Sequence, residues 1–379
     1  MEIHGHCDER FTAVHDALAD GITIDQELDQ HSGASASVTV DGEVVVDLWG
    51  GWAGPAQEWE RDTIVNVYST TKTMAATCVL LLADRGAIDL QAPVATYWPE
   101  FAAAGKEGVT VAHVMGHAAG LSGFELPTTI PDLYDWDRIV ERLAAQAPWW
   151  EPGSAPGYHA VTQGYLQGEI VRRVDGRDID TFFRQEIAEP LGADFQMGVG
   201  PADDERIGEL IPPSELTASR ADLPDGISTR SLTNPTLTAL EPQTRQWRAA
   251  TIPAAGGFGN ARSVARVHSM LACGGTVDRV EVMSPAGVEA ALTDVVEGTD
   301  LVLGTHTRFG MGFGLPSVGL PLPNPRSFSW GGWGGSVAVI DLDARMSIAY
   351  VMNRMEGNLL GDTRGASVLM AAYGSLANS

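Results

Sequence analysis

The alternation of apolar and polar positions predicts β-hairpins near both ends of the chain. Residues 37–46 contain a polar–apolar alternation, an Asp-Gly pair at positions 41–42 and a valine-rich return. An Asp-Gly pair between two such runs is a strong hairpin signal. A second hairpin is predicted from residues 336–340 and 347–352. Both ends of the chain are therefore expected to contribute strands.

Helical periodicity lies beside both predicted hairpins. Apolar positions from Phe11 to Leu18 recur at the spacing of one helix face, and residues 74–83 are rich in helix formers. Residues 262–273 place their apolar side chains on one face, and a last helix is predicted to end near Leu376. The helices at the two ends are expected to cover a sheet that both ends build.

The middle of the chain has a different pattern. Residues 109–240 show helical segments broken by loops rich in Pro and Gly, and residues 212–242 are turn-rich and interpreted as surface loops. We therefore predict an α/β (α+β) fold with one antiparallel sheet and an inserted helical part. Residues 1–95 and 245–379 would form the sheet domain, and residues 96–244 the inserted, mainly helical domain.

Composition and charge narrow the class of partner. Hydrophobic residues make up 44% and charged residues 19% of the 379 positions, which is typical of a folded globular protein, and no apolar run suits a transmembrane helix. A formal net charge of −25 argues against nucleic acid or an anionic membrane surface as a partner. The first ten residues match no secretory or transit peptide, and three scattered cysteines are typical of free thiols. A cytoplasmic location is expected.

The sharpest chemical signal is Ser69-Thr70-Thr71-Lys72 at the start of a predicted helix. Residues three apart share a helix face, so the Lys72 amine can reach the Ser69 hydroxyl. Serine is a weak nucleophile that needs a nearby base, and an unprotonated lysine can serve if burial or a neighbouring charge lowers its pKa. The motif is short enough to occur by chance, so its context decides.

Two later segments supply that context. Tyr158 follows a loop rich in Pro and Gly at residues 151–157, which can present a side chain rigidly. Residues 330–336 consist of two tryptophans, four glycines and a serine, and they lead into a predicted strand. So many glycines next to a strand indicate close approach of another chain or a ligand to the backbone. Taken singly, Tyr158 is equally consistent with a packed aromatic residue, and the glycine run with a bulged strand.

In this order and spacing the segments resemble the superfamily of β-lactamases and penicillin-binding proteins, and within it most closely the family VIII carboxylesterases. The resemblance covers nearly the whole chain and implies the serine β-lactamase-like fold, with the site in the cleft between the two domains. It is carried by residues 67–72, 97–101, 117–121, 150–153 and 157–160 and by the glycine run that begins at Trp330.

The resemblance assigns roles to individual residues. It makes Ser69 the nucleophile, and it makes Lys72 and Tyr158 a coupled pair that removes the serine proton and passes it to the leaving alcohol. It places the oxyanion hole at the main-chain N–H groups of Ser69 and Trp333. It implies a serine carboxylesterase that acts on short-chain or bulky small-molecule esters and needs neither a metal nor an organic cofactor.

Two departures from the lactamase pattern bear on the substrate. Ala160 stands two places after Tyr158, where lactamases have asparagine. Trp330 and Gly331 stand where lactamases have a lysine and a hydroxyl residue that hold the β-lactam carboxylate. An aromatic ring and a glycine offer a carboxylate no bidentate partner, so acidic β-lactams and peptide C-termini are expected to bind poorly, whereas a neutral ester loses nothing.

Apolar aromatic walls suit ester substrates. The residues predicted to contact the substrate are Trp330, Gly331, Gly332, Trp150 and His159. The chain has no Gly-x-Ser-x-Gly elbow, and His113 and His117 lack the adjacent Glu of a zinc-protease motif. Three alternatives stay open: acyl transfer to an alcohol or amine from the same acyl-enzyme, β-lactamase or D-peptidase activity, and a ligand-sensing module that binds or is acylated without turnover.

Overall fold

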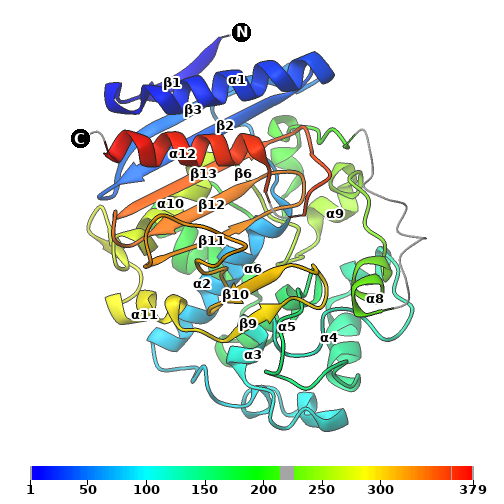
Figure 1. Ribbon diagram of the computed structural model, residues 1–379. Coiled ribbons are helices and arrows are strands. Elements are labelled where there is room, and N and C mark those ends of the chain that lie inside the picture. Colours follow the sequence, from blue (N-terminus) through cyan, green and yellow to red (C-terminus); the bar gives the residue numbers. More distant parts are fainter. Residues whose placement is uncertain (1, 214–225, 360, 378–379) are drawn as a thin grey trace.

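The computed structural model describes residues 2–213, 226–359 and 361–377. Its main sheet is antiparallel and has the strand order β1-β3-β2-β13-β12-β11, with β4 paired to β3 (Figure 1). The strands are β1 (Ile3–Cys7), β2 (Gly33–Val40), β3 (Glu43–Gly54), β4 (Gln57–Glu58), β11 (Ser327–Gly331), β12 (Val337–Asp341) and β13 (Met346–Met352). The predicted fold class, with an antiparallel sheet built from both ends of the chain, is confirmed.

Both predicted hairpins are confirmed by the strand register. Val40 pairs with Glu43 across the expected two-residue turn, and Asp341 pairs with Met346. Strand β13 pairs with β2 over its whole length, which joins the two hairpins into one sheet. Strand β1 was not predicted, because an edge strand with mostly exposed side chains carries no apolar alternation.

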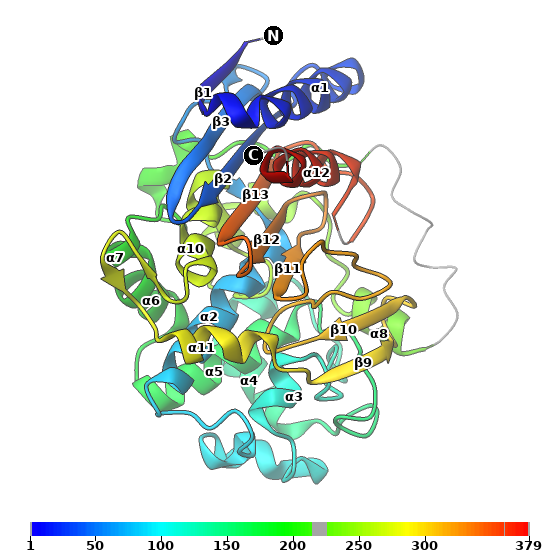
Figure 2. The ribbon, with the colours of Figure 1, turned by 60° about the vertical axis from the view of Figure 1, so that its left-hand side comes forward.

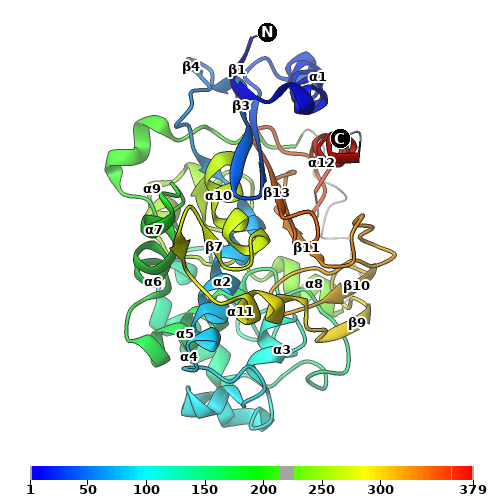
Figure 3. The same ribbon diagram turned by 90° about the vertical axis from the view of Figure 1, so that its left-hand side faces the viewer.

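Helices cover both faces of this sheet (Figures 2 and 3). Helices α1 (Thr12–Leu28) and α12 (Thr363–Ala377) lie side by side on one face, and α10 (Ala261–Ala272) packs against the other. Phe11 and Leu18, predicted to share one helix face, are both buried. The terminal helices and the helix near residues 262–273 are therefore confirmed.

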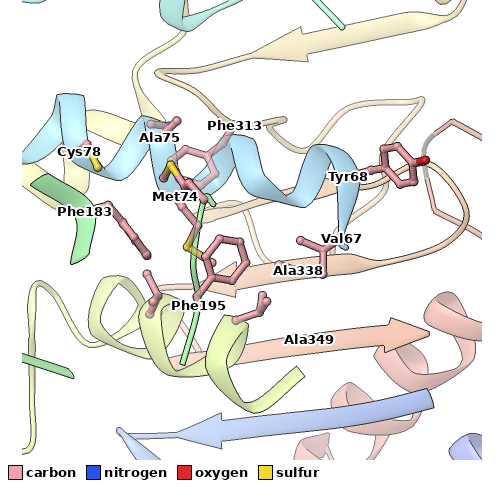
Figure 4. Close-up of a cluster of buried hydrophobic side chains, with 14 of the residues drawn as sticks. Val67, Tyr68, Met74, Ala75, Cys78, Phe183, Phe195, Phe313, Ala338 and Ala349 are labelled. Atoms are coloured by element: carbon pink, nitrogen blue, oxygen red, sulfur yellow. The ribbon is translucent and has the colours of Figure 1, made fainter. Parts of the chain in front are cut away.

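Helix α2 (Thr71–Asp84) runs through the interior, between the sheet and the remaining helices. Every residue from Thr71 to Leu82 is buried, so this helix has no solvent-facing side over that length. Figure 4 shows part of the apolar cluster around it, which includes Met74 and Cys78 of α2 together with Phe183 and Phe195. Because it is enclosed, α2 is a rigid support for the residues at its first turn.

The other helices lie mostly on the side of α2 away from the sheet (Figure 1). They are α3 (Val111–Met115), α4 (Trp136–Ala145), α5 (Thr162–Asp175), α6 (Ile179–Phe183), α7 (Glu189–Leu191), α8 (Ile227–Thr233), α9 (Arg245–Ala249) and α11 (Pro285–Glu289). The short strand pairs are β5 (Val65–Asn66) with β6 (Phe258–Gly259), β7 (Thr276–Val277) with β8 (Val280–Glu281), and β9 (Val296–Thr299) with β10 (His306–Phe309).

The interpretation of residues 212–242 as loops is wrong in part. Residues 214–225 lie outside the described residues, but residues 227–233 form helix α8. Of this helix only Ser231 is fully buried, so it has no apolar face that periodicity could detect. Within the described part of the chain, no helix combines the length and the apolar character needed to cross a bilayer.

Candidate active site

Ser69 lies on a tight turn at the start of the enclosed helix. Residues Tyr68–Thr70 form one 3₁₀ turn that runs directly into α2, and Ser69 is 8% exposed. Tyr68 has a left-handed φ of 43°, a conformation that costs a non-glycine residue about 1–2 kcal/mol. The tyrosine is held there by its ring, 5.1 Å from that of Trp333, and by its hydroxyl, which donates to the Thr238 carbonyl at 3.2 Å. Such strain is typical of functional turns.

The Lys72 amine is buried beside the Ser69 hydroxyl. Its Nζ atom lies 3.2 Å from Ser69 Oγ and donates to the carbonyls of Ala160 at 2.7 Å and Ala254 at 2.8 Å. Burial holds the pKa of Lys72 well below its ordinary value. Two carbonyls use both N–H bonds of a neutral amine and leave its lone pair for the Ser69 proton. This arrangement suits a general base.

Tyr158 approaches the same oxygen from another element. Its hydroxyl donates to Ser69 Oγ at 2.6 Å, and its ring lies 4.9 Å from Lys72 Nζ. Burial raises the pKa of Tyr158, so the phenol keeps its proton in the resting site. Ser69 Oγ therefore has an amine on one side and a phenol donor on the other, and the sequence-predicted trio is brought together.

A buried carboxylate fixes the loop that carries Tyr158. Asp300 follows β9 and is 1% exposed, and its Oδ1 atom accepts the main-chain N–H of Tyr158 at 3.1 Å. The same oxygen accepts the N–H groups of Val302 and Leu303, each at 2.8 Å. Burial raises the pKa of Asp300, whereas these hydrogen bonds lower it. No motif marks this aspartate, so the sequence did not indicate it.

Two neutral histidines lie behind Tyr158. The His117 ring packs edge-on against the Tyr158 ring at 5.1 Å, and its Nδ1 atom accepts the main-chain N–H of His159 at 3.1 Å. His159 is fully buried, accepts the Leu121 N–H at Nε2 and bonds the Gly157 carbonyl through Nδ1. Burial lowers the pKa of both rings, that of His159 to about 3, so they act as fixed hydrogen-bonding spacers.

The turn that carries Trp333 is tied to the backbone around Ser69. The Ser336 hydroxyl donates to the Val67 carbonyl at 2.9 Å. Because that bond uses its proton, Ser336 Oγ accepts the Thr70 hydroxyl at 2.9 Å. These two bonds join the turn to residues on both sides of the serine, which fixes the spacing between the two segments.

A small apolar cavity of about 50 Å³ opens at Ser69. One wall comes from α8 and the segment after it, and the other includes the Trp333 ring. Among the described residues that line it, none carries a charged side chain. The lining residues are Tyr68, Ser69, Tyr158, Ala160, Val161, Ser231, Leu232, Pro235, Leu237, Ala255, Trp333 and Leu359.

Trp330 and Gly331 are not among the described residues that line this cavity, and their contact with substrate stays a prediction. They line a second apolar cavity of about 130 Å³. The Trp330 ring stacks on His117 at 5.5 Å and packs against the Tyr158 ring at the same distance. Trp330 therefore buttresses Tyr158 from behind, since its bulk fills the space next to that ring.

The other predicted contact residues also lie outside the cavity at Ser69. The Trp150 indole donates to the Ala155 carbonyl at 3.0 Å and braces the loop before Tyr158. His159 is fully buried, and its ring bonds the Leu121 N–H and the Gly157 carbonyl. A Cβ atom on Gly332 would lie 2.2 Å from the Val67 carbonyl oxygen, so glycine is required there by close packing of two backbones.

Comparisons with known proteins find similar chains over most of the sequence. A family model described as Beta-lactamase matches residues 23–372. A solved structure titled a family VIII carboxylesterase is 42% identical with a TM-score of 0.92, covering 99% of this chain and 100% of that one. A penicillin-binding protein homologue from Caulobacter crescentus is 38% identical with a TM-score of 0.89, covering 99% of this chain and all of its own. The esterase/beta-lactamase LipL of Mycobacterium tuberculosis is 38% identical over 85% of this chain and 77% of LipL.

Proposed function

The chain belongs to the beta-lactamase family, and from that membership we propose that it is a serine carboxylesterase that hydrolyses small neutral esters through an acyl-enzyme on Ser69. One observation carries the proposal. Ser69 Oγ lies 2.6 Å from the Tyr158 hydroxyl and 3.2 Å from Lys72 Nζ, at the floor of a cavity whose described lining residues carry no charge. A nucleophile, a base and a proton donor thus meet where an ester carbonyl can enter.

Acylation begins with proton transfer from Ser69 to the neutral Lys72 amine. The serine oxygen then bonds to the ester carbonyl carbon, and the C=O electron pair moves onto oxygen to give a tetrahedral oxyanion. When that pair returns, the bond to the alcohol oxygen breaks and the acyl group stays on Ser69. The alkoxide takes a proton from Tyr158, which regains one from Lys72, so the proton count balances.

The oxyanion requires donors aimed at it before reaction. We assign the main-chain N–H groups of Ser69 and Trp333 to this role, because Ser336 ties their two segments together. In other enzymes, removing one such donor costs roughly 3 kcal/mol of transition-state stabilisation. Deacylation repeats the steps with water as nucleophile, and the carboxylic acid leaves with Ser69 restored.

The cavity argues for neutral substrates. A carboxylate placed against the described lining residues, none of which is charged, would lose hydration without gaining a cationic partner among them. The chain as a whole carries a formal charge of −25, which adds long-range repulsion. The described lining comes from residues 96–244 and from both flanking segments, which fits a site between the proposed inserted domain and the proposed sheet domain.

A matched pair of esters tests this selectivity. We expect methyl 4-(butyryloxy)benzoate to be hydrolysed with a kcat/KM at least thirtyfold higher than 4-(butyryloxy)benzoic acid, since burying the unpaired carboxylate costs about 2 kcal/mol. The measurement is the initial rate of butyrate release from each ester, repeated at high salt to screen the net charge.

The selectivity should survive added salt, because it arises in the cavity. Equal rates for the acid and its methyl ester would refute the neutral-substrate proposal. Efficient turnover of a chromogenic cephalosporin would instead favour the β-lactamase alternative.

A further inference from the structure

Two glycines with left-handed backbone follow Trp333. Gly334 has φ of 98° and Gly335 has φ of 129°. A Cβ atom on Gly335 would lie 1.9 Å from Asp362 Oδ2, and one on Gly334 would lie 2.7 Å from Met355 Cγ. A turn with this backbone is flexible in isolation, so contacts from outside must select one conformation.

The contact on Gly334 comes from the terminal helix. Arg364, in the first turn of α12, donates from Nη2 to the Gly334 carbonyl at 2.9 Å. The same carbonyl accepts the main-chain N–H of Glu356 at 3.0 Å. On the opposite side, Ser336 anchors the end of the turn to the segment around Ser69. The turn is therefore clamped at both ends.

Arg364 is itself held by a buried ion cluster. Its other N–H groups reach Asp362, Asp25 of α1 and the Arg354 carbonyl, so all five donors of the guanidinium are used. Arg354 also donates to Asp25 at 2.9 Å. Asp25, Arg354 and Arg364 are each under 10% exposed. A buried ion cluster is weak evidence of a stabilising role, because hydrophobic side chains of similar volume often fill a core equally well.

We propose that Arg364 is a positioning residue for catalysis, which fixes the Gly334 carbonyl and thereby the turn whose Trp333 N–H stabilises the oxyanion. This inference rests on the proposed function. Its physical basis is that hydrogen-bond donors stabilise a transition state in proportion to how well they are aimed before reaction. Arg364 lies in α12, which covers one face of the sheet, and thus acts on the site through its hydrogen bond to the Gly334 carbonyl.

The test compares Arg364→Gln with Arg354→Gln. Both variants break the ion cluster around Asp25, but only the first removes the side-chain donor to the Gly334 carbonyl, which keeps the Glu356 N–H in both. Each is assayed with p-nitrophenyl butyrate well below its own unfolding midpoint. We expect Arg364→Gln to lower kcat about tenfold to hundredfold with KM changed less than about twofold. Arg354→Gln should lose stability but keep its kcat within about twofold.

A second readout isolates the oxyanion hole. An alkylboronic acid forms a tetrahedral adduct with a serine nucleophile, so its affinity should fall in Arg364→Gln by about the same factor as kcat. Arg364→Lys keeps a cation near Asp25 and Asp362 but cannot span both and Gly334, so it should stay folded and show the same kcat loss.

Equal kcat losses in the Arg364 and Arg354 variants, or wild-type kcat in a folded Arg364 variant, would overturn the inference. Failure of the proposed function looks different. If Ser69→Ala retains wild-type hydrolysis, the site assignment itself is wrong. If Ser69→Ala is inactive while Arg364→Lys is fully active, only the positioning role falls.

Discussion

Ser69→Ala is expected to reduce ester hydrolysis by about four orders of magnitude or more, because it removes the atom that forms the acyl bond. The measurement is kcat/KM for p-nitrophenyl butyrate, with folding checked by the unfolding midpoint. Lys72 and Tyr158 remain in the variant but have no oxygen to activate. Residual activity would come from binding and polarisation of the ester alone.

Thr77→Ala is the matched control for this variant. Thr77 is likewise a buried hydroxyl residue, but it lies within α2 and donates to the Thr73 carbonyl at 2.7 Å. The control should hydrolyse the ester at close to the wild-type rate, since its hydroxyl lies away from the cavity. Comparable activity in Ser69→Ala and the wild type would contradict the assignment of Ser69.

Lys72→Arg is expected to lower kcat/KM by about a thousandfold, although arginine is also a long side chain with a basic end group. Arginine stays protonated at any working pH and so cannot accept the serine proton. The natural control is Lys106→Arg, because the chain contains only these two lysines. Lys106 is also buried and donates to the carbonyls of Ala103 at 2.7 Å and Ala144 at 2.9 Å, among the helices of the middle segment.

Lys106→Arg should cost stability but not the catalytic rate of the folded protein. The wild-type pH profile adds a second check. Burial lowers the pKa of Lys72, and the neutral amine is the active form, so kcat/KM should fall as the pH drops through that lowered pKa. If Lys72→Arg retained activity and its kcat/KM fell over the same acidic pH range, a group other than Lys72 would be responsible for that fall.

Local signals predicted the part of the site that lies within one element. Ser69 and Lys72 are three residues apart where the 3₁₀ turn runs directly into α2, so their contact follows from helical spacing. The Asp-Gly turn likewise determined the register of the first hairpin. Tyr158 joined them through family resemblance, since no local rule connects residues 89 positions apart.

The rest of the site depends on long-range packing that leaves no periodic trace. Asp300 reaches Tyr158 from 142 residues away, and the Ala254 carbonyl reaches Lys72 from 182 residues away. Main-chain acceptors have no residue-type signature at all. The cavity that Trp330 lines could not be predicted either. Side chains of a strand point to alternate faces, and the packing of the sheet decides which cavity each face meets.

Detection of the acyl-enzyme tests directly whether Ser69 is the nucleophile. The protein is mixed with p-nitrophenyl butyrate, quenched in acid within the first turnovers, and analysed by intact mass and peptide mapping. We expect a butyryl adduct on the peptide that contains Ser69 in the wild type, and none in Ser69→Ala. An adduct on a different residue, or hydrolysis at full rate with no adduct under conditions that trap the intermediate, would contradict it.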